Sequence, residues 1–283
     1  MAEKKESFYS IVKKWVVNDY KTPDVKAEVL IDMLISEYIK EIFDSYPELP
    51  GEGQAFLISK EFPIKNYTEH EKNDNCRIYK ESGNNKSGAV DYLVGKGDTL
   101  YLTELKTDSN SFSDDQLIRM IMTKERGVDK LLEYYKKVLI HTGKKDKRLY
   151  QLKQFAENTG LTEVASMRLL PKNVDDYLFL DKLKSRFSRI EIIYILLDRK
   201  MIPSNSMITS RDYHVKLNEG SQYQFCDLLK DYHKADYGTM KYRNKGSQDN
   251  KTIYVMELKS CKLQNKADTY WNNIKDIIKG CLE

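Results

Sequence analysis

The sequence has few cysteines, and their spacing excludes the usual cysteine-based frameworks. Its four cysteines, Cys76, Cys226, Cys261 and Cys281, lie far apart, and no two of them form a C-x-x-C pair. Structural zinc sites need closely paired cysteine and histidine ligands, and small disulfide-stapled domains are dense in cysteine. Neither kind of framework is therefore expected.

Long apolar runs are also lacking. The longest, Ile192–Leu197, is far shorter than the ~20 apolar residues that cross a bilayer. The first seven residues, Met-Ala-Glu-Lys-Lys-Glu-Ser, contain no apolar segment of the kind found in secretory signals. We therefore expect a soluble cytoplasmic protein that does not associate with membranes.

Several common catalytic motifs are missing as well. The chain has no G-x-x-x-x-G-K-[ST] phosphate loop, no G-x-G-x-x-G after a strand, no H-E-x-x-H and no G-x-S-x-G. Its four histidines, His70, His141, His214 and His233, are scattered along the chain. Carboxylates and lysines remain as the side chains for any chemistry.

Composition and charge set broad limits. Hydrophobic residues make up 40% of the 283 residues, which is enough to build a sizeable core. The 47 lysines and arginines against 43 acids give a net charge of +4, which is compatible with nucleic-acid binding but does not demand it. Without repeats or a clear linker, we expect one domain over 1–283. Its core covers about 22–200 and a C-terminal extension about 201–283.

The periodicity of apolar residues predicts an α/β fold with a mixed sheet. The expected strands cover residues 54–64, 76–80, 89–94, 99–104, 191–197 and 252–258. The expected helices cover 8–16, 23–42, 113–140, 148–158, 174–187 and 225–233, with a last helix from Ala267. The polar segment Lys65–Asn75 is expected to be a loop.

The most informative segment is the predicted hairpin over 89–106. Its first strand contains Asp91, and its second ends in Glu104-Leu105-Lys106. Residues two apart on a strand share a face, so Glu104 and Lys106 lie on one side of the sheet, and Asp91 on the adjacent strand can converge with them. Two carboxylates and the Leu105 carbonyl form a hard-oxygen site suited to Mg²⁺ or Mn²⁺. The Lys106 ammonium can orient a water, so these groups suit phosphodiester hydrolysis.

The tripeptide [DE]-x-K is not specific by itself. Three copies end a predicted strand, at Glu104, Asp198 and Glu257. Glu257-Leu258-Lys259 even repeats Glu-Leu-Lys. Only Glu104 has an aspartate on a strand across a hairpin, so we expect the site there and not at Glu257.

An aspartate on one strand and Glu-x-Lys on the next resemble the PD-(D/E)XK nuclease superfamily. That family has a restriction-endonuclease-like core of a helix, three strands, a second helix and a fourth strand. The predicted order matches it over Pro23–Leu197, about two thirds of the chain. Val90 stands where the family motif has proline, and Met120 stands where the RecB-like branch has tyrosine, so that branch is not supported.

The resemblance implies a role for each site residue. Asp91 and Glu104 would bind the metal, and Lys106 would assist the attacking water. A glutamate on the preceding helix often joins the metal ligands in the family, which points to Glu28. A polar residue early in the following helix often contributes, which points to Gln116.

The function expected on this basis is a nuclease that depends on Mg²⁺, with Mn²⁺ as a substitute. Its partner is nucleic acid, with DNA favoured over RNA and internal cleavage favoured, and a homodimer is left open. Restriction or phage defence follows by family analogy alone. The alternative is an inactive nuclease-fold module that binds nucleic acid or a protein partner. A third reading is that the C-terminal third binds a partner protein and the core serves only as its platform.

Overall fold

The structure is a computed structural model. It describes residues 10, 12–14, 16–17, 27–73, 76–81, 87–108, 111–141, 183–198, 212–216, 222–226, 239–244, 248–249, 251–263 and 269–283. None of the helices in these ranges combines the length and the apolar composition needed to cross a membrane.

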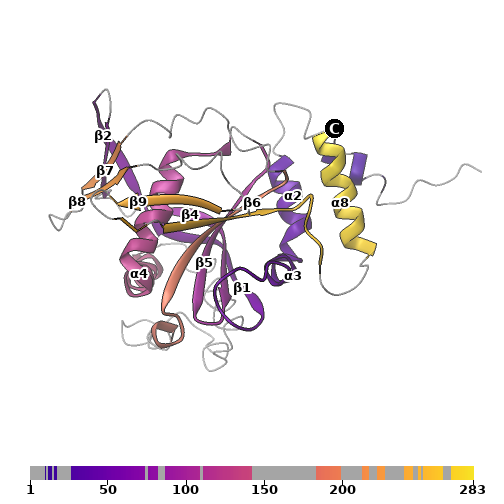
Figure 1. The fold of residues 1–283 in the computed structure, drawn as a ribbon, viewed down its shortest axis with the longest axis horizontal. Helices are drawn as coiled ribbons and strands as arrows, with labels where there is room; N and C mark the ends of the chain where they lie inside the picture. Colours follow the sequence, from indigo (N-terminus) through magenta and orange to yellow (C-terminus); the bar gives the residue numbers. More distant parts are fainter. Residues whose placement is uncertain are drawn as a thin grey trace, which may run out of the picture.

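The described residues form an α/β fold around a mixed sheet (Figure 1). The strands are β1 Ala55–Lys65, β2 Tyr67–Asn73, β3 Cys76–Glu81, β4 Ser87–Lys96, β5 Thr99–Lys106, β6 Arg189–Leu196, β7 Asp212–Lys216, β8 Gln222–Cys226, β9 Thr239–Asn244 and β10 Lys251–Glu257. The helices are α2 Ala27–Ser36, α3 Ile39–Asp44, α4 Asp114–His141 and α8 Thr269–Leu282.

Ten strands pair in one continuous order, β1-β4-β5-β6-β10-β9-β8-β7-β3-β2. In the first five of these, β4 runs antiparallel to both β1 and β5, whereas β6 runs parallel to both β5 and β10. The sheet is therefore mixed, and its parallel strands β5, β6 and β10 end at the same edge.

The core has two layers, one on each face of the sheet. On one face, Leu102 of β5 and Ile192 of β6 pack with Leu117 and Ile121 of α4. On the other face, α2, α3 and α8 supply the cover, as the ribbon in Figure 1 shows. Alternate residues of each central strand therefore enter different cores.

Strand β5 lies between two neighbours and under helices on both faces, and all eight of its residues are buried. Its apolar members, such as Leu100 and Tyr101, fit that position. Glu104 and Lys106 do not, because charged side chains are rarely buried unless they are paired. These two residues mark the end of β5 as the unusual part of the sheet.

Most predicted strands of the core are confirmed, since β1, β3, β4, β5, β6 and β10 match them within a few residues. The loop predicted over Lys65–Asn75 is wrong, because β2 occupies most of it by pairing with β3. The helix predicted over 225–233 is wrong at its start, where Phe225 and Cys226 belong to β8 and pair with β9.

Three other predicted helices are confirmed, and two lie wholly or mostly outside the described residues. The helices predicted over 23–42, over 113–140 and from Ala267 correspond to α2 with the start of α3, to α4 and to α8. The helix predicted over 148–158 lies outside the described residues, as does most of the one predicted over 174–187, of which residues 183–186 are helical.

Candidate active site

A tight hairpin brings Asp91 to the end of β5. Strands β4 and β5 are joined at Gly97, whose φ of 57° lies in the left-handed region that favours glycine. The register pairs Tyr92 with Thr103, which sets Asp91 beside the last residues of β5. The Leu105 N–H donates a hydrogen bond of 2.7 Å to Asp91 Oδ2. The backbone of β5 thus fixes the Asp91 carboxylate.

Glu104 and Lys106 share the face of β5 that α4 covers. Glu104 is 0% exposed and Lys106 is 4% exposed. Lys106 Nζ lies 3.3 Å from Glu104 Oε2 and donates a hydrogen bond of 2.7 Å to Gln116 Oε1 of α4. The ammonium is therefore held from two sides. The structure brings four of the predicted site residues together: Asp91, Glu104, Lys106 and Gln116.

Burial sets the electrostatics of the two carboxyl groups. Burial raises the pKa of Asp91, although the Leu105 N–H and the Lys106 charge oppose the shift. Burial raises the pKa of Glu104 well above its ordinary value, and the nearby charge of Asp91 raises it further. A buried glutamate and a half-buried aspartate thus compete for one ammonium. Such like-charge pairs are typical of functional sites.

Glu104 has an oxygen atom that fits a metal ligand. Its buried Oε1 receives no hydrogen bond from a lysine, amide or hydroxyl donor among the described residues, and Glu104 and Asp91 can hydrogen-bond to each other only when one of the two acids is protonated. The described part of the chain contains no group of three or more histidine, cysteine or acidic side chains placed to hold an ion. Mg²⁺ is usually held by only one or two carboxylates, with water and substrate phosphates completing its shell. Asp91 and Glu104 fit that donor set.

A third acid, Asp32 of α2, lies near the pair and was not expected. Its Oδ2 forms an ion pair of 2.9 Å with Lys60, and its Oδ1 accepts a hydrogen bond from the Tyr92 hydroxyl. Its charge contributes to the raised pKa of Asp91. The predicted helical acid, Glu28, lies one turn earlier in α2, and its side chain is outside the described part. The spacing of four residues is the signal that relates the two positions.

The second Glu-Leu-Lys copy is built differently. Lys259 pairs with Asp198 at 2.8 Å, and the Glu257 carboxylate accepts a hydrogen bond from the Ser260 hydroxyl at 2.5 Å. The Glu257 backbone also bonds with the Tyr46 hydroxyl. Glu257 lies on β10, on the far side of β6 from the end of β5. The two copies therefore form separate clusters on one sheet.

Comparisons of the chain with protein-family models, with curated proteins and with solved structures give no match. Functional inference therefore rests on the geometry of the site.

Proposed function

We propose that this protein is a metal-dependent nuclease that hydrolyses phosphodiester bonds in DNA, with a restriction-endonuclease-like core and its active site at Asp91, Glu104 and Lys106. The observation that carries the proposal is the buried Glu104–Lys106 pair beside a second carboxylate. A fold gains nothing in stability from a buried glutamate and a half-buried aspartate that share one base, since burying charge is costly. A catalytic task explains their presence.

Each residue has a definable part in the reaction. Asp91 and Glu104 would hold a Mg²⁺ ion, which supplies Lewis-acid stabilisation of phosphate charge. Lys106 would orient a water molecule toward the phosphorus and offset the charge that develops there. Gln116, by accepting a hydrogen bond from Lys106, would keep the ammonium in position. Water serves as the nucleophile, so the reaction needs no covalent intermediate with the protein.

The order of elements supports the proposed core. Helix α2 precedes β1, β4 and β5, and α4 then leads to β6, which joins β5 in parallel. The hairpin of β2 and β3 is an insertion between β1 and β4 and lies at the other end of the strand order. Without that hairpin, the succession is the helix, three strands, helix and strand that the PD-(D/E)XK resemblance implies. A cytoplasmic role in restriction or phage defence is part of this proposal.

A second candidate is an inactive module with the same core that binds nucleic acid or a protein. The contacts of Asp32 favour it, because Lys60 and Tyr92 already occupy both oxygens of this acid, whose charge acts on Asp91. A site limited to two carboxylates holds a metal less firmly than one with three. A measurement of catalytic turnover distinguishes the nuclease from the inactive module.

The deciding experiment incubates purified protein with supercoiled plasmid, linear DNA and RNA in Mg²⁺, in Mn²⁺ and in EDTA. We expect nicked or linear plasmid in either metal and none in EDTA. Glu104→Gln should abolish the cleavage. Glu257→Gln is the matched control, because it is the same change in the same tripeptide, and it should cleave like the wild type.

Three results would count against the nuclease. Intact substrates under every condition would favour the inactive module. Cleavage by Glu104→Gln would show that the active site does not include Glu104. Loss of cleavage in Glu257→Gln alone would move the centre to β10 and leave the β4–β5 hairpin with a structural role.

A further inference from the structure

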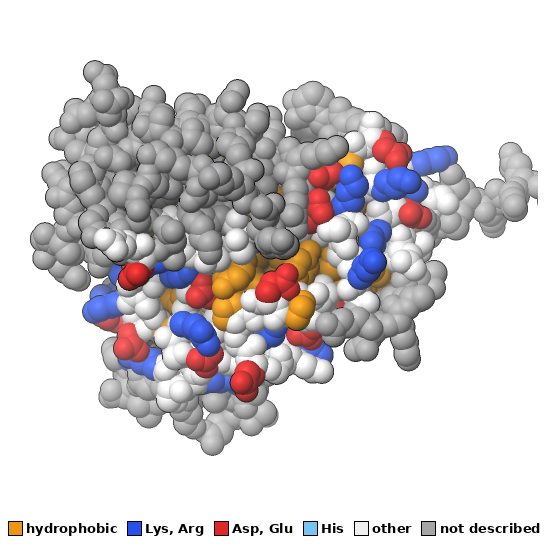
Figure 2. All heavy atoms as spheres, in the orientation of Figure 1, with side chains coloured by type: hydrophobic (Ala, Val, Ile, Leu, Met, Phe, Trp, Pro, Cys, Tyr) orange, Lys and Arg blue, Asp and Glu red, His pale blue; other side chains and the backbone are white. Residues whose placement is uncertain are grey.

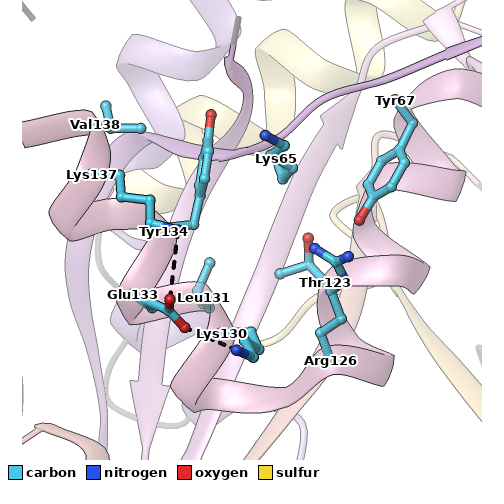
Figure 3. A pocket seen from close by; sticks show the side chains of 10 residues that line it. All are labelled: Lys65, Tyr67, Thr123, Arg126, Lys130, Leu131, Glu133, Tyr134, Lys137 and Val138. Atoms are coloured by element: carbon cyan, nitrogen blue, oxygen red, sulfur yellow. Dashed lines mark hydrogen bonds and ion pairs between the residues drawn. The ribbon is translucent and has the colours of Figure 1, made fainter. Parts of the chain in front are cut away.

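A basic pocket lies away from the acidic centre, as we call Asp91 and Glu104. It is formed by the end of β1, the start of β2 and the middle of α4 (Figure 3). We call it the α4 pocket, and its volume is about 130 Å³. The residues that matter here are Lys65, Tyr67, Arg126, Lys130, Tyr134 and Lys137. Figure 3 shows Lys65 and Tyr134 on one side of it, and Arg126 and Tyr67 on the other.

The charge of the α4 pocket selects an anion. Four cationic side chains line it, and Glu133 is its one carboxylate. Lys130 and Lys137 lie 3.1 Å and 3.5 Å from Glu133 and lower the pKa of that acid, so it stays charged near neutral pH. One carboxylate leaves the lining with a clear excess of positive charge. Figure 2 shows acidic and basic side chains intermingled on one face of the molecule.

The size of the pocket limits what it can hold. A cavity of about 130 Å³ is roughly ten times the ~10–15 Å³ that is needed to hold one water molecule. It falls short of the ~300–1,000 Å³ of most small-molecule sites. A single phosphate group fits this range better than a whole nucleotide cofactor. Arg126 offers the planar donor fork that binds phosphate oxygens in pairs.

Helix α4 connects the pocket to the acidic centre. Polar residues recur every three or four positions before the kink at Gly127, so they form one row: Gln116, Arg119, Thr123 and Arg126. Gln116 bonds with Lys106 at one end, and Arg126 lines the pocket at the other.

Arg119 lies between the two ends of this row. It donates a hydrogen bond of 3.1 Å to Asn66, which precedes β2, and its buried Nε has no partner among the described residues. The row therefore offers a further donor between the centre and the pocket.

The distance along this row matches a nucleic acid strand. Ten residues separate Gln116 from Arg126, which corresponds to about 15 Å at a helical rise of ~1.5 Å per residue. B-form DNA rises ~3.4 Å per base pair along its axis, so 15 Å measured along that axis corresponds to about four base pairs. We infer that the α4 pocket binds a backbone phosphate about four base pairs from the scissile bond. This inference rests on the proposed function, since it takes the Asp91–Glu104 centre as the point of cleavage.

The test measures binding without cleavage. A fluorescein-labelled 20-base-pair DNA duplex is titrated with the full-length protein in EDTA, over a series of salt concentrations, and anisotropy is recorded. Arg126→Gln and Lys137→Gln remove one pocket cation each. Lys279→Gln is the matched control, because Lys279 of α8 pairs at 3.7 Å with Glu283, four residues away and just past the end of α8, as Lys137 pairs with Glu133 four residues away on α4.

We expect each pocket variant to weaken duplex binding about tenfold, as for the loss of a hydrogen bond to a charged group. The slope of log K against log salt should become shallower by ~0.9 for each lost phosphate contact. Lys279→Gln should bind like the wild type. Unchanged binding in both pocket variants, or an equal loss in Lys279→Gln, would overturn the inference.

Two further measurements are made. One distinguishes a free phosphate from a DNA phosphate as the ligand of the pocket, and the other distinguishes failure of this inference from failure of the proposed function. If the wild type binds inorganic phosphate or adenosine monophosphate but not the duplex, the pocket holds a free phosphate and the strand inference is overturned. Plasmid cleavage in Mg²⁺ is measured in parallel. Weakened binding in the pocket variants without any wild-type cleavage refutes the nuclease and keeps the α4 pocket as a DNA contact. Wild-type cleavage with unchanged binding in the variants refutes the pocket alone.

Discussion

Replacing Glu104 by glutamine should stabilise the metal-free protein while it abolishes cleavage. The carboxylate is fully buried, and its Oε1 receives no hydrogen bond from a lysine, amide or hydroxyl donor among the described residues. A buried charged group without enough hydrogen-bond partners costs about 1–3 kcal/mol or more. Glutamine keeps the shape and removes both the charge and its repulsion with Asp91. Lys106 keeps its hydrogen bond to Gln116 and the nearby charge of Asp91, so the ammonium is not left alone.

The gain in the free energy of unfolding of Glu104→Gln should depend on pH. Because the pKa of Glu104 is raised above its ordinary 4.5 in the folded protein, the folded state holds this proton to a higher pH than the unfolded chain does. Stability is therefore full below pH 4.5 and falls as the pH rises through the folded pKa. Glu104→Gln removes that loss. Its advantage of about 1–3 kcal/mol should be present at pH 8 and absent at pH 4.

The measurement is urea and thermal unfolding of both proteins in EDTA at these two pH values. A change of 1 kcal/mol moves the melting temperature of a large domain by ~2–4 °C, so we expect a rise of about 2–12 °C at pH 8. Mg²⁺ at 100 times its dissociation constant should add ~2.7 kcal/mol to the wild type and little to the variant. A variant less stable than the wild type in EDTA at pH 8 would show that Glu104 serves as a structural partner of Lys106, which would refute this reasoning.

Four other substitutions test the remaining parts of the site and of α4. Lys106→Met should retain Mg²⁺ binding by calorimetry and lose plasmid cleavage, and cleavage at the wild-type rate would remove its role. Asp91→Asn should abolish cleavage with an unchanged circular dichroism spectrum. Asp32→Asn removes a charge that raises the pKa of Asp91, so the acid limb of the pH–rate profile should move to lower pH; an unmoved limb would contradict the coupling. Gly127→Ala should lower the free energy of unfolding in urea by about 1–3 kcal/mol, because Gly127 has φ 79° and ψ 178° inside α4; an unchanged value would show that the kink relaxes freely.

The central strands could be predicted because their sequence and their surroundings agree. Residues 99–106 alternate between two cores, and the run over 192–196 is apolar on both faces, as a strand under helices on both sides requires. Strand β2, with the sequence Tyr-Thr-Glu-His-Glu-Lys-Asn, has no such pattern. It is a strand because its backbone pairs with β3, and β3 in turn pairs with β7, which lies far along the chain. Local periodicity contains no information about such partners.

The site was predictable to the same extent and for similar reasons. The two-residue period of β5 and the hairpin turn are local, and they are enough to place Glu104, Lys106 and Asp91 on neighbouring strands. Gln116 entered only through the family resemblance, because its contact with Lys106 depends on how α4 lies across the sheet. Asp32 was missed because the side of α2 that faces the sheet is set by packing.

The parallel pairing of β5 with β6 has a consequence for synthesis. Thr99 pairs with Arg189, ninety residues later, so β5 waits for its neighbour while the intervening chain is made. At ~5–20 residues per second, translation of that interval takes about 5–18 s. During this time the edge of β5 that later pairs with β6 has unpaired backbone groups, which are open to water and to the strands of other chains. A ribosome-associated chaperone that shields residues 99–106 until β6 emerges would therefore act at the step where this protein is most exposed to aggregation.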